Sequence, residues 1–256
     1  MILDEFDSNP VAVFNAFDFK QKIEGFPKTI VGFFSHELVE EFVKSYKPEV
    51  ITTVKSYTTN FPIYKVTIGS EDIAVIQAPL GSPYCVELFE EIICLGAEKI
   101  MMCGSCGCLE SGIADYSIVI PTSAIRDEGT SYHYAPASDE IEVNAEAVKS
   151  IENTVKSLGL NYLKGKTWTT DALYRETPAK VAKRKSQGAI VVDMECSAMV
   201  AFAKFRGITF GEVFYGADDL SKDEYDIRSL LDGDISVQSK IIPIVLKCAE
   251  NLSKGV

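Results

Sequence analysis

Two carboxylates stand at the junction between an apolar run and a helical pattern. Asp193 and Glu195 follow the apolar residues 189–192. A carboxylate at the start of a helix is stabilised by the helix dipole, so either residue can act as a cap. An ionised pair at the end of a buried strand is costly unless it has partners, and a carboxylate can accept hydrogen bonds from the vicinal hydroxyls of a sugar. The residues alone leave capping and sugar binding equally open.

A second pair of carboxylates, Asp218 and Asp219, ends another apolar run. Asp218 directly follows the predicted strand, where desolvation can raise its pKa until the group holds a proton near neutral pH. A carboxyl in that state can act as a general acid. The acidic stretch that follows is interpreted as a solvated face, and its spacing does not match a calcium-binding loop.

The segment Gly104-Ser105-Cys106-Gly107 extends a third apolar run with small residues. In a tight turn, successive backbone N–H groups can form an anion-binding nest, and the Ser105 hydroxyl adds a donor. The lysine of a Walker motif and the third glycine of a dinucleotide-binding motif are missing. We expect a tight turn here, either structural or anion-binding. The C-G-S-C spacing suggests a redox or zinc site, but without a second CxxC pair buried structural cysteines are favoured.

The composition excludes several classes of protein. The 256 residues are 46% hydrophobic and 24% charged, which is typical of a globular protein. The net charge of −12 argues against a nucleic-acid partner. No apolar run reaches the length of a membrane span, and the acidic start lacks the basic region of a signal peptide. Seven cysteines are too few and odd in number for a disulfide scaffold. We expect a cytoplasmic protein with no membrane contact.

Strand and helix patterns alternate along the chain and must position these carboxylates. We predict strands at residues 29–34, 50–54, 61–68, 73–79, 99–103, 117–122, 164–169, 189–194 and 208–215. We predict helices at residues 35–46, 83–95, 144–158, 178–186, 195–206 and 236–251. Continuously apolar strands are typical of sheets covered on both faces. The sequence therefore predicts one α/β domain over residues 1–256, with a mixed sheet and a site where strands end in loops.

Taken in order, these segments resemble the nucleoside phosphorylase family, which includes uridine phosphorylase and hexameric purine nucleoside phosphorylase. The resemblance covers roughly residues 75 to 220. Five motifs carry it: the phosphate-and-ribose loop at 104–107, the uridine-type segment at 124–134, the base-pocket segment at 170–174, the ribose motif at 192–195, and Ala217-Asp218 where purine enzymes carry Ser-Asp.

The resemblance implies a three-layer α/β/α sandwich around a mixed, partly barrel-like central sheet. It also implies a homo-oligomer, a dimer or a hexamer, whose sites borrow residues from a neighbouring subunit. The implied reaction is phosphorolysis, in which phosphate attacks C1′ of a ribonucleoside to give free base and ribose 1-phosphate. Inorganic phosphate is then a co-substrate, and neither a further cofactor nor a metal is implied.

The resemblance also assigns roles to individual residues. The general acid would be Asp218, with Arg228 as its charged partner at a shorter spacing than the family shows. The remaining assignments are Glu195, Met194 and Ser105 for ribose, Ser105 and Gly104 for phosphate, and Asp171, Tyr174, Arg175 and Glu176 for the base.

The chain departs from the family at the phosphate site. Family enzymes hold phosphate with arginines, whereas this chain has no arginine before Arg126, and Met102 stands where one is expected. Lysine cannot reproduce the bidentate fork of arginine. Two residues remain as phosphate ligands: Arg126, folding back toward Gly104, and Lys55, reaching across from a neighbouring subunit.

Three functions are compatible with these observations. The leading hypothesis is a nucleoside phosphorylase for uridine or a purine nucleoside. A nucleosidase, in which water replaces phosphate, and a nucleoside-binding protein without turnover are the alternatives. Asp218 favours purines, whereas Arg175 and the segment 126–134 favour pyrimidines, so the base preference stays open.

Overall fold

The computed structural model describes residues 2–222 and 224–255. Its strands are β1 (Thr29–Phe33), β2 (Glu49–Lys55), β3 (Asn60–Ile68), β4 (Glu71–Gln77), β5 (Lys99–Cys108), β6 (Ile118–Asp127), β7 (Glu140–Glu142), β8 (Tyr162–Thr170), β9 (Ala189–Asp193) and β10 (Thr209–Asp219). Its α-helices are α1 (His36–Tyr46), α2 (Ser82–Leu95), α3 (Ala145–Ser157), α4 (Pro178–Ser186), α5 (Cys196–Arg206), α6 (Ile235–Gln238) and α7 (Ile241–Lys254). Short 3₁₀ turns lie at Ile2–Asp4, Ala16–Asp18, Thr130–His133 and Leu173–Arg175.

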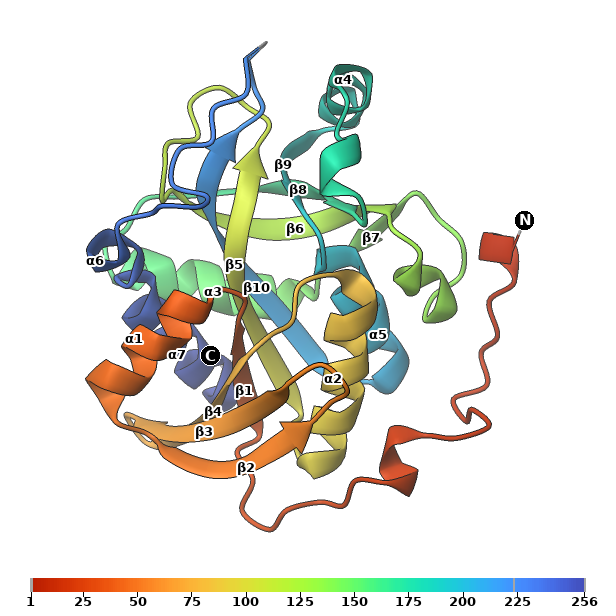
Figure 1. Cartoon of the computed structure of the whole chain (residues 1–256), viewed down its shortest axis with the longest axis vertical. Coiled ribbons are helices and arrows are strands. Elements are labelled where there is room, and N and C mark those ends of the chain that lie inside the picture. The colour runs from red at the N-terminus through yellow and green to blue at the C-terminus, as the bar shows by residue number, and fades with distance from the viewer. Residues whose placement is uncertain (1, 223, 256) are drawn as a thin grey trace.

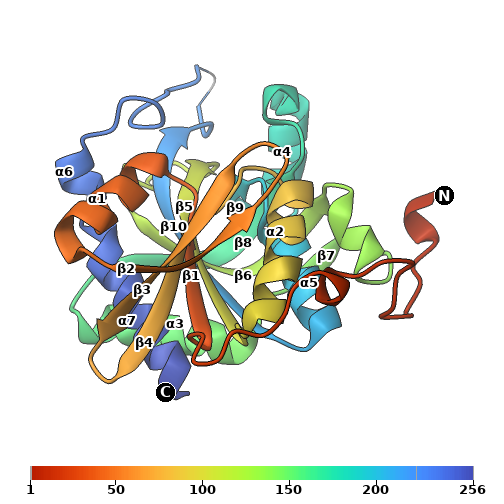
Figure 2. The same ribbon diagram turned by 60° about the horizontal axis from the view of Figure 1, so that its bottom comes forward.

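One mixed sheet contains these strands in the order β10-β6-β8-β9-β5-β1-β4-β3-β2, with β7 paired to β6. β10 also pairs in parallel with β5, so strands β5, β10, β6, β8 and β9 close into a barrel. The strands β1 to β4 continue from β5 as an open, twisted extension, which Figures 1 and 2 show from two directions. The predicted mixed, partly barrel-like sheet is confirmed.

Helices cover the sheet on both sides, as the three-layer prediction requires. α3 and α7 pack against each other and against β1, β5 and β10, whereas α2 and α5 pack together on the other side (Figure 1). The local sequence explains where these helices begin. The Ser35 hydroxyl accepts the Leu38 N–H at the start of α1, and the Asn144 side chain accepts the Ala147 N–H at the start of α3. Both are standard N-cap contacts.

Two sequence predictions about the elements are wrong. The segment 104–108 is not a tight turn, because β5 runs through it to Cys108 in pairing with β10 and β9. The helix predicted at 236–251 is divided into α6 and α7, which are separated by Ser239 and Lys240. Local pattern indicates helix in the second case, but it does not locate the break.

In the part of the chain that the structure describes, none of the helices combines the length and apolar character needed to cross a membrane.

Candidate active site

The sheet register brings the predicted segments together at one place in the barrel. Asp218 on β10 is paired with Gly107 on β5, which is paired in turn with Val192 on β9. Neighbouring strands lie about 4.8 Å apart, so this row spans adjacent strands. A Cβ at Gly107 would lie 2.7 Å from Val192 Cγ1 and 3.3 Å from Asp218 Oδ1. Glycine is therefore required here by the close approach of its neighbours.

Asp193 is the helix cap of this site. Its Oδ2 accepts the N–H groups of Glu195 and Cys196 at 2.8 and 2.6 Å, at the start of α5. Its Oδ1 accepts the hydroxyls of Thr167 and Thr169 at 2.8 and 2.9 Å. Both oxygens are thus occupied inside the protein. For Asp193 the structure decides between the two open interpretations in favour of capping.

Glu195 is in a different state from Asp193, although it is almost as deeply buried. Only 5% of the residue is exposed, and its Oε1 accepts the Gly81 N–H at 2.5 Å. Burial and the nearby charge of Asp193 raise the pKa of Glu195 to about 8. Its side chain makes no capping bond to α5. The structure therefore does not support capping of α5 by the Glu195 side chain.

The segment that contains Gly104 and Ser105 continues β5 past the end of β9. β9 pairs antiparallel with β5 at Val192, and this direction carries the chain after β9 toward Cys106 and Ser105. The charges of Asp193 and Asp218 both act on the buried Cys106 thiol, whose pKa is raised mainly by burial. Because β5 is extended here, successive N–H groups alternate in direction. The anion-binding nest predicted for this segment is therefore not formed.

Asp218 is positioned as a candidate acid at the end of β10. It is 4% exposed, and the Tyr225 hydroxyl donates to its Oδ2 at 3.0 Å. Burial raises its pKa, while the Tyr225 hydrogen bond and the charge of Arg228 act in the opposite direction. The net shift is upward, which is the direction that a general acid needs.

Arg228 is bonded to a different carboxylate from the one expected. Its Nη2 donates to Asp219 Oδ2 at 2.6 Å, and its Nη1 donates to the Ile113 carbonyl at 2.9 Å. The prediction that Arg228 pairs directly with Asp218 is corrected by this geometry. Arg228 acts on Asp218 only as a nearby charge.

The predicted base-binding residues lie between β8 and α4. The Asp171 carboxylate accepts the Gly129 N–H at 2.9 Å, and its charge raises the pKa of Glu195. The Tyr174 side chain is 94% exposed, and Arg175 is exposed beside it. Glu176 is half-buried, and its pKa is raised to about 7 by burial and by the charges of Asp218 and Asp193. Glu176 is thus the sheltered member of this segment, whereas Tyr174 and Arg175 face solvent.

The two residues proposed to replace the phosphate arginines are held elsewhere in the single chain. The buried Arg126 guanidinium donates to Ser131 Oγ at 2.8 Å, to the Pro136 carbonyl at 2.7 Å and to Ser138 Oγ at 2.8 Å. Lys55 ends β2 on an exposed hairpin, beside a cavity of about 320 Å³ along α2. Arg126 therefore does not fold back toward Gly104, and the role of Lys55 in a neighbouring subunit stays a prediction.

Sequence reasoning missed two residues of the site. Gly81 supplies the N–H that Glu195 accepts, and its φ of +92° requires glycine at this position. Its place just before a predicted helix start was the available signal. Tyr225 lies in the stretch that was interpreted as a solvated face, and no local pattern distinguishes it.

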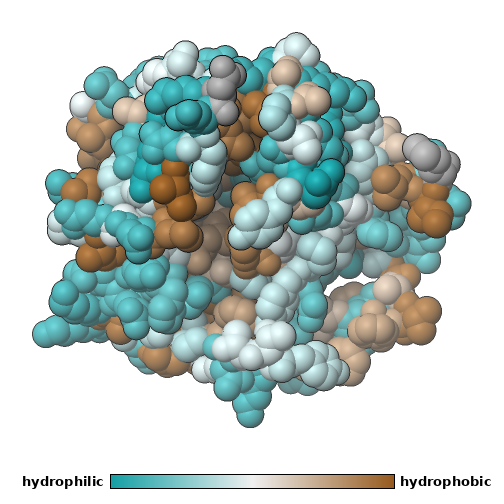
Figure 3. Space-filling model, turned by 45° about the horizontal axis from the view of Figure 1, so that its top comes forward, coloured by the Kyte–Doolittle hydropathy of each residue, from teal (hydrophilic) through white to brown (hydrophobic). Residues whose placement is uncertain are grey.

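The surface around this end of the molecule is hollowed. The loop after β10 and helix α4 lie at the same end in both ribbon views. Figure 3 looks toward that end and shows a depression near its centre with apolar side chains on its floor. Among residues 2–222 and 224–255, no group of three His, Cys, Asp or Glu side chains is arranged to hold a metal ion.

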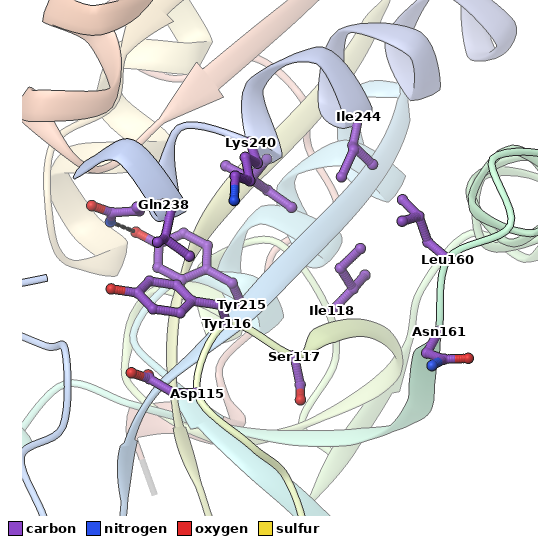
Figure 4. Close-up of a pocket in the computed structure, with 12 residues that line it drawn as sticks. Asp115, Tyr116, Ser117, Ile118, Leu160, Asn161, Tyr215, Gln238, Lys240 and Ile244 are labelled. Atoms are coloured by element: carbon purple, nitrogen blue, oxygen red, sulfur yellow. Dashed lines mark hydrogen bonds between the residues drawn. The ribbon is translucent and has the colours of Figure 1, made fainter. Parts of the chain in front are cut away.

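A separate cavity of about 350 Å³ opens between the start of β6 and helices α6 and α7 (Figure 4). Tyr116 and Tyr215 line it, and Gln238 Nε2 donates to the Tyr215 hydroxyl at 2.6 Å. None of the predicted ribose, phosphate or base ligands lines this cavity. It is therefore distinct from the carboxylate site.

Comparison with known protein families identifies the family of this chain. The phosphorylase superfamily matches residues 28–250. The chain belongs to the phosphorylase superfamily. This confirms the family expected from the sequence motifs, and the matched region contains every predicted site residue of the chain.

Similar proteins in the superfamily are named as phosphorylases of different nucleosides. A guanosine phosphorylase of Halorubrum lacusprofundi is 24% identical over 157 residues, which cover 60% of this chain and 64% of that protein. A uridine phosphorylase of Thermococcus kodakarensis is 32% identical over 124 residues, which cover 47% of this chain and 42% of that protein. The alignments thus span less than two thirds of these relatives.

Two solved structures share the fold. A purine nucleoside phosphorylase of Toxoplasma gondii in complex with immucillin-H superposes with a TM-score of 0.75 at 21% identity, covering 90% of this chain and 93% of that one. An AMP nucleosidase of Bacteroides thetaiotaomicron superposes with a TM-score of 0.71 at 18% identity, covering 90% of each chain. At these identities the likeness concerns the fold alone, and it includes both a phosphorylase and a hydrolase.

Proposed function

We propose that the protein is a nucleoside phosphorylase that cleaves the N-glycosidic bond of a ribonucleoside and transfers the ribosyl group to inorganic phosphate. The observation that carries this proposal is the state of Glu195. It is a buried carboxyl with one oxygen bonded to a backbone N–H and no role in capping α5. The groups that act on it are the Gly81 N–H and the charges of Asp193 and Asp171. The relatives named guanosine and uridine phosphorylase support the same reaction class.

Glu195 would orient the sugar. A carboxylate accepts hydrogen bonds from two vicinal hydroxyls. These bonds would favour the ionised form of Glu195, so binding of the ribose would lower the pKa of this carboxyl and release its proton to water. Breaking of the C1′–N bond develops positive charge on the ribose, which a negative group beside the ring stabilises. Because Glu195 is buried, this interaction would be stronger than it is in water.

Asp218 would assist the departing base. The electron pair of the C1′–N bond passes to the base, and a purine takes up a proton at a ring nitrogen as it leaves. A protonated Asp218 supplies that proton, a contribution of typically about 10²- to 10⁴-fold. An oxygen of phosphate forms the new bond to C1′, which gives ribose 1-phosphate.

Hydrolysis is the second candidate, and the positions of the arginines favour it. The chain has five, of which Arg126, Arg184, Arg206 and Arg228 bond to other protein groups and Arg175 is exposed beyond β8. In the described residues, the one contact that an arginine makes with the segment 104–108 is from Arg228 Nη1 to Cys108 Sγ at 3.6 Å, and none is with Gly104 or Ser105. A phosphate at this place would depend on the neighbouring subunit. Water as the nucleophile needs no such cation.

One assay distinguishes these functions. The purified protein is incubated with uridine, inosine, guanosine or adenosine, with and without inorganic phosphate, and free base and sugar are separated chromatographically. We expect base release that requires phosphate and yields ribose 1-phosphate. Equal release without phosphate, with free ribose as product, would establish the nucleosidase instead. Binding without release of base would reduce the protein to a nucleoside-binding function.

A further inference from the structure

The loop after β10 turns back along the end of that strand. The Asp219 N–H donates to the Asp226 carbonyl at 2.8 Å, and the Asp226 N–H donates to the Asp219 carbonyl at 3.1 Å. Two residues that exchange both hydrogen bonds form an antiparallel bridge and share one face of it. Their neighbours in the chain point to the opposite face. Asp218 and Tyr225 therefore lie on that opposite face, as diagonal neighbours across the bridge.

The side chains around the bridge are bonded as its register requires. On one face, the Arg228 guanidinium donates to Asp219 Oδ2 at 2.6 Å. On the other face, the Tyr225 hydroxyl donates to Asp218 Oδ2 at 3.0 Å. Among residues 2–222 and 224–255, this hydroxyl is the only group that is hydrogen-bonded to the Asp218 carboxyl. The bridge thus gives the candidate acid a tyrosine as its partner, in place of the arginine that the sequence suggested.

The two oxygens of the Asp218 carboxyl have different surroundings. Oδ2 accepts the hydroxyl of Tyr225. Oδ1 lies on the side of Gly107, where a Cβ atom would be 3.3 Å from it, and the described residues make no hydrogen bond to Oδ1. Burial and the charge of Asp218 raise the pKa of Tyr225, so the phenol keeps its proton and remains a donor. Because Oδ2 already accepts this donor, a proton on the carboxyl belongs on Oδ1.

We propose that Tyr225 is a positioning residue for the protonation of a departing purine base: its hydroxyl holds Oδ2 of Asp218 and thereby places the transferable proton on Oδ1. This inference rests on the proposed cleavage of a nucleoside. Tyr225 acts through Asp218. A hydrogen bond to an ionised carboxylate is stronger than one to a neutral carboxyl, so the Tyr225 bond gains strength as the proton leaves. The same contact therefore orients the acid and stabilises its conjugate base.

The protons and electrons of the step balance as follows. The C1′–N bond breaks, and its electron pair passes to the base. The Oδ1 proton moves to a ring nitrogen of the purine, which leaves Asp218 as an anion bonded to Tyr225. An oxygen of hydrogen phosphate forms the new bond to C1′. The proton that the phosphate releases on forming this ester balances the proton that Asp218 recovers from water.

Other charged or titratable groups act on Asp218 or on its neighbours. They come from the end of β10 and the loop after it, from β5, from β9, from the segment after β8 and from α4. They are Asp219 and Arg228, Cys106 and Cys108, Asp193, Tyr174 and Glu176, and Lys180. Among the influences that lower the pKa of Asp218, the Tyr225 hydrogen bond is the largest, followed by the charge of Arg228. Removal of the phenol should therefore raise the pKa of Asp218.

The test is the pH profile of kcat/KM for inosine in Tyr225→Phe. This change removes the hydroxyl and keeps the ring, which belongs to an exposed residue. The plateau of the profile should fall about tenfold, because the proton is no longer confined to Oδ1 and the anion loses its donor. The alkaline limb should move to higher pH by about one unit, because the acid holds its proton more tightly. A lower plateau together with a higher limb is the expected signature.

Tyr162→Phe is the matched control. It also removes a phenol that donates to a carboxylate, in this case Glu152 Oε1 at 2.7 Å. Tyr162 begins β8, at the end of the strand opposite to the site. The plateau and the limb of this variant should both match those of the wild type. Urea unfolding of the two variants shows whether either change affects the fold.

The outcomes separate this inference from the proposed function. A plateau loss in Tyr225→Phe without a shift of the limb would reduce Tyr225 to a structural role and overturn the inference. An unchanged plateau, or a limb that moves to lower pH, would overturn it as well. If the wild type releases base from uridine and from no purine nucleoside, the inference fails while the proposed function stands. If the folded wild type releases no base from any nucleoside, the proposed function itself fails.

Discussion

Arg228 is paired with Asp219 and not with Asp218: its Nη2 donates to Asp219 Oδ2 at 2.6 Å. The two carboxylates are consecutive on β10, so their side chains point to opposite faces of the strand. Burial raises the pKa of Asp219, but the Ser221 hydrogen bonds and the charge of Arg228 outweigh this and lower it overall. Asp218 on the other face shifts upward. The pKa values of these adjacent residues are thus shifted in opposite directions. Asp219 is a structural anion, and Asp218 is the candidate acid.

The ion pair predicts the effect of Arg228→Asn. Asparagine tolerates the left-handed backbone of this position, where φ is +44°, but it removes the guanidinium. The buried Asp219 carboxylate then loses its guanidinium partner and keeps only Lys222 and the Ser221 N–H among the described residues, so we expect the free energy of unfolding to fall by about 1–3 kcal/mol. The ratio of kcat/KM for inosine to that for uridine should change little. Urea unfolding and activity assays with inosine and uridine check this. A loss of activity on inosine alone would show that Arg228 acts with Asp218 after all.

The sequence identified most elements of the fold because their determinants are local. The apolar runs and the caps at Ser35 and Asn144 fix where strands and helices begin. The prediction for the segment after Cys103 was wrong because small residues are compatible with both a turn and a crowded strand. Its extended form is decided by pairing with β10 and β9, whose paired residues lie about 83 to 111 positions away in the chain. No local pattern contains that information.

The site, like the fold, could be predicted only where its determinants are local in the sequence. The position of Glu195 after a buried strand left capping and sugar binding open, and the structure shows that its side chain makes no capping bond to α5. The division of labour with Asp193 was not predictable, because it depends on hydroxyls of Thr167 and Thr169 on a neighbouring strand. The link from Gly81 to Glu195 joins residues that are 114 positions apart. Such contacts follow from the fold and not from spacing.

The buried Glu195 carboxyl predicts an unusual dependence of stability on pH. Its pKa of about 8 in the folded protein lies above the ordinary value of 4.5, so the folded state retains a proton that the unfolded chain has lost. This contribution is fully present below about pH 4.5 and is lost as the pH rises through about 8. Each pKa unit corresponds to about 1.4 kcal/mol, so the total is several kcal/mol. We expect Glu195→Gln to be more stable than the wild type at pH 8, with a difference that disappears toward pH 5.

Urea midpoints at pH 5, 6.5 and 8 measure this difference. The control is Glu146→Gln, an exposed carboxyl whose removal should leave the pH dependence of the wild type unchanged. Parallel curves for Glu195→Gln and the wild type would show that the carboxyl is not held protonated. The same variant should lose about 10- to 100-fold in kcat/KM for every nucleoside, because the sugar contact is common to all of them.

Because Gly107 lies against both Val192 and Asp218, a larger residue at this position should affect the packing of the strands and the activity of Asp218 together. In Gly107→Ala the new methyl group would lie 2.7 Å from Val192 Cγ1 and from Leu220 Cδ1, and 3.3 Å from Asp218 Oδ1. We expect a loss of stability of about 1–3 kcal/mol from overpacking, together with a larger loss of activity on inosine than on uridine. Gly129→Ala is the matched control, because Asp171 Oδ2, at 3.8 Å, is the one non-adjacent atom of the described residues that would lie within 4 Å of the added methyl group. Similar losses in the two variants would contradict a special role for the Gly107 contact.

The phosphate site makes the last prediction, because Arg126 and Lys55 should respond differently to substitution. The Arg126 guanidinium is buried and bonded within the segment 131–138, so Arg126→Met should lower stability without a selective change in the KM for phosphate. Lys55 is exposed at the end of β2 and is free to reach a neighbouring subunit, so Lys55→Met should raise the KM for phosphate about tenfold and leave that for the nucleoside nearly unchanged. Lys65→Met, which removes an equal charge from the adjacent strand, serves as the control. If the wild type requires phosphate and Lys55→Met leaves the KM for phosphate unchanged, then other donors hold the phosphate.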